Sequence, residues 1–277
     1  MLDERGDVSV HVIERSINVT PRCEATLRMR DDVTSTEFAD VLVSIDGLLD
    51  GNPCEVVGTE FGPFSSVSAV DWAGVSEEAW AAVAERVRRS TDIGIRRMTE
   101  GDWSVIVTAQ GSEITDGVDA IRTAIAGDPL EPALGMTTWG MSWSPGKEST
   151  AGYHRIEVEA DRTPPAALGD ALVKVASIVD PLRPEGADDA EASPQSPVVG
   201  VDVSVTIVDG VSNVNFRLAV HDWTSEAMAA NEAEYLNDSV AASTAQDLIT
   251  AIADSGLEVG SVRVVANDTL RWGDAVE

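Results

Sequence analysis

Residues 27–35 read Leu-Arg-Met-Arg-Asp-Asp-Val-Thr-Ser, an alternating apolar segment that ends in aspartate and in side chains that cap helices. Residues two apart on a strand share a face, so Leu27 and Met29 are expected to face a core. The Thr34 hydroxyl can accept one of the N–H groups that a helix leaves unpaired at its start. With Glu37 three residues later, it completes the capping-box pattern. The stretch therefore predicts a strand, an exit from the sheet and the start of a helix.

The same pattern recurs along the chain. It reads IEVEADRTP over residues 156–164 and LAVHDWTS over residues 218–225, with a looser copy over residues 67–76 in which Ser76 opens the helix. The repeated aspartate has two interpretations: a shared acidic site, or the chemistry of leaving a strand and entering a helix. We favour the second, and we expect Thr163 and the prolines after it to begin the helix of the 156–164 copy.

The rest of the chain follows the same order of elements. Hairpins joined by helices predict an α+β fold with mainly antiparallel sheets, built from repeated strand–strand–helix units with the helices on one face. We predict about three such units with an extra strand and helix over residues 1–182, then an acidic linker rich in proline and alanine over residues 183–197. A C-terminal α+β unit over residues 198–277 is expected to contain a hairpin around Asp209-Gly210. The recurrence resembles an old internal duplication, and residues 1–182 are open to being one domain or two.

The chain is strongly acidic. Its formal net charge is −29 at pH 7, with 48 acidic and 19 basic residues, and its lysines are Lys147 and Lys174. Such a charge repels nucleic-acid phosphates and anionic lipid headgroups, and it speeds the encounter with basic partners. We therefore expect a basic protein as the partner, and neither nucleic acid nor a membrane. The same composition also suits an acidic surface that keeps a protein soluble in a salty cytoplasm, and a GC-rich genome that replaces lysine by arginine.

The sequence predicts a cytoplasmic protein. The first residues lack the basic and apolar segments of a secretory signal, and no apolar run approaches the roughly 20 residues that span a bilayer. Cys23 and Cys54 are too few for a disulfide framework, and we expect them to be reduced and buried.

Residues 137–143 supply the main candidates for a binding surface. Alternation places Trp139, Met141 and Trp143 on one strand face, with small residues on the other. A ligand platform or a protein interface would use these side chains in this way, and so would the core of a sheet. Asp222 and Trp223, in the 218–225 copy of the pattern, complete the set of candidate binding residues.

The sequence contains no pattern that carries familiar catalytic chemistry. It lacks the P-loop, the Gly-x-Gly-x-x-Gly turn, the Cys-x-x-Cys and His-x-x-x-His pairs and the Gly-x-Ser-x-Gly elbow. The three histidines occupy predicted strand positions, where a structural or surface role is expected. We therefore predict no catalytic residue, metal ligand or cofactor, and we regard a non-enzymatic protein as the better hypothesis.

Three functional hypotheses follow from these observations. The first is an acidic protein-binding module, such as an immunity or antitoxin-like inhibitor of a basic partner protein. The second is a structural subunit of a larger assembly, such as a phage or secretion particle. The third is a small-molecule-binding protein or enzyme that uses the strand face of Trp139 and Trp143.

Overall fold

In the computed structural model, the chain folds into two compact units. One comprises residues 1–107 and 127–138, and the other comprises residues 108–126 and 139–277. The residues that the structure describes are 6–13, 22–48, 54–61, 65–69, 72–89, 93–98, 102–110, 114–127, 130–135, 137–144, 154–182, 198–220, 240–266 and 270–273.

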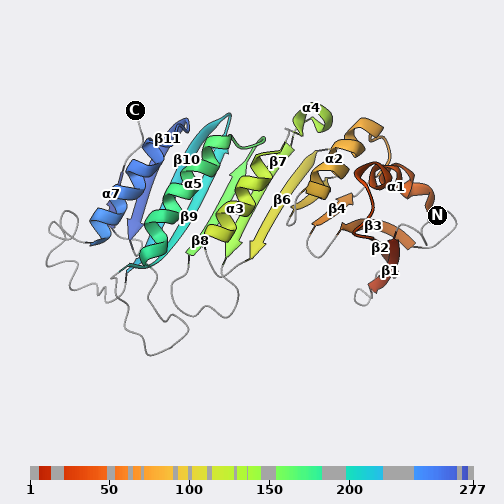
Figure 1. The fold of residues 1–277 in the computed structure, drawn as a ribbon, viewed down its shortest axis with the longest axis horizontal. Coiled ribbons are helices and arrows are strands. Elements are labelled where there is room, and N and C mark those ends of the chain that lie inside the picture. The colour runs from red at the N-terminus through yellow and green to blue at the C-terminus, as the bar shows by residue number, and fades with distance from the viewer. Residues whose placement is uncertain are drawn as a thin grey trace. The chain divides into compact units, whose positions relative to one another are not determined.

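The first unit is built on strands that follow one another across the sheet in chain order. These are β1 (Gly6–Ile13), β2 (Arg22–Met29), β3 (Cys54–Phe61), β4 (Ser65–Ala69), β5 (Ile93–Arg97) and β6 (Trp103–Gln110), whose last three residues belong to the second unit. Its helices are α1 (Ser35–Leu48), α2 (Glu77–Arg89) and the short α4 (Glu131–Leu134). Helices α1 and α2 pack against each other over the strands (Figure 1).

The second unit has the same layout. Its elements are α3 (Ile114–Ile125), β7 (Thr137–Ser144, from Trp139 onward), β8 (His154–Ala160), α5 (Ala166–Val179), the 3-10 turn η2 (Asp180–Leu182), β9 (Val198–Val208), β10 (Val211–Val220), α7 (Val240–Ala253), β11 (Val259–Ala266) and β12 (Leu270–Trp272). Helices α3, α5 and α7 lie side by side over one face of these strands (Figure 1). The predicted linker lies outside the described residues, and β8 and β9 on either side of it pair with each other.

The expected α+β composition is present, but the prediction of mainly antiparallel sheets is wrong, because the sheet is mixed. Strands within a hairpin are antiparallel, as in β3 with β4 and β9 with β10. Strands joined through a helix are parallel, as in β2 with β3 and β8 with β9. A helix that spans the sheet returns the chain to the end from which the previous strand started, so the next strand runs in the same direction. An origin of the recurring element order by duplication stays a prediction.

The strand–helix–strand connections between parallel strands alternate between right-handed and left-handed crossovers. In the first unit, β2 and β4 run in opposite directions, while both of their crossovers advance the same way across the sheet. Because α1 and α2 cover the same face, the two crossovers have opposite hands, and one of them is left-handed. The same reasoning applies to the crossovers through α5 and α7 in the second unit. Parallel crossovers are right-handed in about 98% of cases, so each unit contains a rare connection.

Local capping chemistry explains where the first two helices begin. The Thr34 hydroxyl accepts the Glu37 N–H at 3.2 Å, and the Glu37 carboxylate accepts the Thr34 N–H at 3.0 Å. The predicted capping box is therefore confirmed. Ser76 likewise accepts the Ala79 N–H at the start of α2. The expected cap at Thr163 is wrong, because α5 begins at Ala166 with Pro165 as its N-cap and no side-chain cap.

The substitution Thr34→Ala should lower the free energy of unfolding by about 1 kcal/mol, because it removes the acceptor of the capping box. Thr36→Ala is the matched control, since Thr36 is an exposed threonine inside the same helix and alanine is the better helix former. Chemical denaturation of both variants measures the difference. Equal stability of the two would show that the cap contributes nothing.

A close approach between α3 and β7 depends on Gly117. A Cβ atom at this position would lie 2.2 Å from Cγ of Trp143, a ring that is 1% exposed. Glycine is usually unfavourable inside a helix, by roughly 0.5–1 kcal/mol relative to alanine. Here it is required because the helix rests directly on the indole.

We expect Gly117→Ala to destabilise the protein by about 1–3 kcal/mol, since overpacking outweighs the gain in helix propensity. Gly140→Ala is the control, because a Cβ at Gly140 meets nothing within 4 Å. Denaturant unfolding with near-UV circular dichroism would report both stability and the tryptophan environment. A neutral or stabilising Gly117→Ala would contradict the packing described.

Candidate functional site

The predicted tryptophan face lies inside the second unit. Trp139, Met141 and Trp143 on β7 are 2%, 2% and 1% exposed. This burial is the arrangement that the sheet-core interpretation expects, with Gly117 of α3 against the Trp143 ring. Asp222 and Trp223, the other candidate binding residues, lie outside the described residues.

A groove of about 580 Å³ lies between α1 and α2 in the first unit. It is lined by side chains on successive turns of both helices: Ser35, Thr36, Ala39, Asp40, Val43 and Ser44 from α1, and Glu77, Ala81 and Glu85 from α2. The strand directions make α1 and α2 antiparallel, since each helix runs back along the strand before it and β2 opposes β4. The hydrogen bond from Arg88 Nη1 near the end of α2 to the Asp31 carbonyl before α1 (3.1 Å) agrees with this orientation.

Small side chains keep the groove open. Ala39 and Ala81 occupy the middle of the two walls, where larger residues would fill the space between the helices. Val43 adds an apolar side chain that is 45% exposed, although α1 is otherwise buried along its apolar stripe. The groove therefore combines an apolar strip, made of Ala39, Ala81 and Val43, with solvent access.

The charged groups among the described lining residues are all acidic. Asp40, Glu77 and Glu85 contribute carboxylates, and none of the described residues that line the groove is a cation. Glu85 forms an ion pair with Arg89, its neighbour one turn later on α2, at 2.6 Å. Both side chains are largely exposed, so this pair contributes little to stability. For Asp40 and Glu77, no ion pair is found within the described part of the chain.

The other arginines of α2 make structural contacts. Arg86 is 5% exposed and lies against Gly127, where a Cβ atom would meet its guanidinium. Arg88 stacks on the Phe61 ring at 4.6 Å while it bonds the Asp31 carbonyl. Arg86 and Arg88 thus hold the unit together, and Arg89 pairs with Glu85. Asp40 and Glu77 are the groove carboxylates with no ion pair among the described residues.

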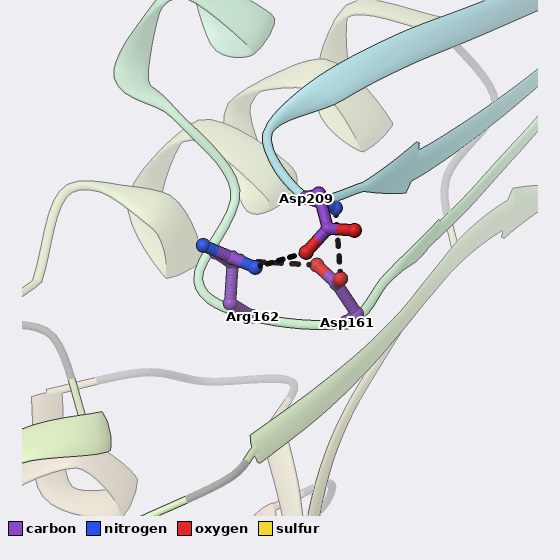
Figure 2. Close-up of polar contacts among 3 residues, drawn as sticks. All are labelled: Asp161, Arg162 and Asp209. Atoms are coloured by element: carbon purple, nitrogen blue, oxygen red, sulfur yellow. Dashed lines mark hydrogen bonds and ion pairs between the residues drawn. The ribbon is translucent and has the colours of Figure 1, made fainter.

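A second polar cluster, Asp161–Arg162–Asp209, fixes a hairpin turn in the second unit. Asp161 follows β8 and accepts the Asp209 N–H through Oδ2 at 2.8 Å (Figure 2). Arg162 bridges the two acids, with Nε 3.2 Å from Asp161 Oδ1 and Nη2 2.9 Å from Asp209 Oδ1. Asp209 has a positive φ of 53° and Gly210 a φ of 87°, the backbone that a two-residue hairpin turn requires. The predicted hairpin at Asp209-Gly210 is confirmed.

The contacts of this cluster explain its electrostatics. The Asp209 N–H, and after it the Arg162 guanidinium, hold the pKa of Asp161 below its ordinary value of 3.8. Hydrogen bonding and charge from Asp161 raise the pKa of Arg162. All three side chains hold the end of a strand and the turn beside it, which agrees with a structural role for the aspartate of the 156–164 pattern.

The turn cluster should make stability depend on pH in acid. Because the pKa of Asp161 is lowered on folding, its charge contributes stability that is complete above pH 3.8 and is lost as the pH falls below that value. We expect Asp161→Asn to have a lower free energy of unfolding than the wild type at neutral pH. This difference in free energy should disappear below about pH 4. Urea unfolding across this range tests it.

Asp247→Asn is the control for that series, because Asp247 is an exposed aspartate inside α7. The difference in free energy of unfolding between Asp247→Asn and the wild type should stay small at every pH. A gap between wild type and Asp161→Asn that does not change with pH would show that the Asp161 charge has no part in the turn.

His154 has a structural contact among the described residues. His154 is 5% exposed, and its Nδ1 accepts the Val201 N–H at 3.2 Å. Within the described ranges, no three His, Cys, Asp or Glu side chains are grouped to hold a metal ion, and no helix is long and apolar enough to cross a membrane. No protein-family model, curated protein or solved structure matches the chain.

Proposed function

We propose that this protein is a non-enzymatic acidic protein-binding module that recognises a basic partner protein, as an immunity or antitoxin-like inhibitor does. The groove between α1 and α2 carries the proposal. It is a solvent-accessible hollow whose described lining residues include an apolar strip and three carboxylates, with no cation among them. Such a surface is complementary to a partner with lysine or arginine around an apolar contact.

The charge of the whole chain supports the same proposal. A net charge of −29 attracts basic proteins over distances beyond direct contact and raises the rate of productive encounters. Opposite charges on the two proteins also make association sensitive to ionic strength, since the Debye length is about 8 Å at physiological salt. In this proposal the overall charge steers the partner and the groove supplies the contact.

A structural subunit of a larger assembly is the second candidate. Strand β1 lies at one end of the strand order of its sheet and pairs with β2 alone among the described strands. An exposed strand edge is a template for pairing with another chain. Light scattering distinguishes the candidates, because self-assembly requires oligomers that grow with protein concentration, whereas a binding module stays monomeric until its partner is added.

Affinity capture from the native host at low and high salt, read by mass spectrometry, tests the proposed function. We expect one stoichiometric basic protein that is released by salt. The double variant Asp40→Lys/Glu77→Lys should weaken capture by about tenfold or more, because it replaces two acidic contacts of the groove by repulsive ones.

The control is Asp116→Lys/Asp247→Lys in the second unit. Asp116 lies in the first turn of α3, as Glu77 does in α2, and Asp247 lies inside α7, as Asp40 does in α1. Both double variants change the net charge equally. Equal loss of capture would assign the effect to overall charge alone, and an empty capture at low salt would overturn the proposed function.

A further inference from the structure

We infer that the groove between α1 and α2 receives a basic amphipathic helix of the partner. This inference rests on the proposed function and specifies the shape of the bound segment. Three features support it: the apolar strip of the groove, the spacing of its carboxylates and the hydrogen-bonding state of its walls.

The apolar lining of the groove fits an apolar stripe. It consists of Ala39, Ala81 and Val43, and Val43 is among the large hydrophobic side chains that are substantially exposed. Val43 lies one turn after Ala39 on α1, so it extends a shallow apolar strip from the two alanines along the direction of the helices. A partner that contributed only charge would leave this strip uncovered.

The carboxylates are spaced for a helix of a few turns. Ser35 and Ser44 mark the ends of the α1 wall, which spans about 14 Å at a rise of 1.5 Å per residue. Glu77 and Glu85 stand about 12 Å apart on the α2 wall by the same measure. Asp40 lies midway along the opposite wall. Cationic side chains about two turns apart on one flank of a helix, with a third between them on the other flank, match this arrangement.

The walls favour a helix over an extended segment. Both walls are helices whose backbone groups beyond the first turn are bonded internally, so they offer no strand edge to the backbone of a ligand. One of the few hydroxyls present, that of Ser44, already donates to the Asp40 carbonyl at 2.8 Å. A helical ligand satisfies its own backbone and presents side chains alone, which is what the groove accommodates.

The test uses a fluorescent peptide of about 15 residues, made of lysine, leucine and alanine in an amphipathic helical order. A peptide of the same composition in scrambled order carries the same charge without the apolar stripe. Fluorescence anisotropy with the full-length protein at low salt measures both affinities. The expected result is at least about tenfold tighter binding of the amphipathic peptide.

A variant that fills the middle of the groove without changing its charge makes the test specific to the groove. Ala81→Phe, at an exposed position, should weaken binding of the amphipathic peptide by about tenfold or more. Ala253→Phe, at an exposed alanine that ends α7, is the control and should leave binding unchanged within about twofold. If Ala81→Phe does not fold, as judged by circular dichroism, Thr36→Phe on the opposite wall replaces it.

The outcomes separate this inference from the proposed function. Equal binding of the two peptides, or full binding by Ala81→Phe, would overturn helix docking in the groove. A basic partner captured from the host would keep the proposed function in that case, and undiminished capture of that partner by Ala81→Phe would again exclude the groove. An empty capture at low salt overturns the proposed function whatever the peptides do.

Discussion

Burial of a single face of each sheet beneath its helices is the constraint on which the other features depend. Alternate strand residues such as Leu27, Val105 and Val158 are fully covered, and the helices supply the facing stripe with residues such as Phe38 and Leu172. Removing apolar area of this kind from water is the main favourable term in folding. Because the longer helices of each unit lie on that face, neighbouring helices meet along their flanks. The groove between α1 and α2 is one such meeting line, held open by alanine.

Several arginines are engaged in local contacts. Arg86 is buried, Arg88 stacks on Phe61, and Arg162 bridges two aspartates at a turn. These cations stabilise local structure and are not available to offset acids elsewhere. With few lysines in the chain, Asp40 and Glu77 of the groove keep their negative charge with no ion pair among the described residues.

Local patterns in the sequence predicted much of the element order, the capping box at Thr34 and the hairpin at Asp209-Gly210, because each depends on residues close together in the chain. Strand pairing across a helix was not predictable in the same way. Alternation identifies the buried face of β2 and β3, yet it is the same for parallel and antiparallel neighbours. The groove was missed because Asp40 and Ala81 are distant in sequence and meet only through the packing of two helices. The apolar residue Val43 was a signal that could have been followed, since it falls beside the buried stripe of α1.

The alternating crossovers determine how a protein of this design can change in length. If one hairpin and its helix were removed, the strand before the deletion and the strand after it would run in opposite directions. These two strands could then not pair in parallel. Restoring parallel pairing with the helices on the same face would require every later connection to reverse its hand. Removing two successive hairpins with their helices requires no such reversal. The architecture therefore changes in length most easily by two hairpins with their helices. Insertion or deletion of one hairpin with its helix would be disfavoured by the geometry of the crossovers.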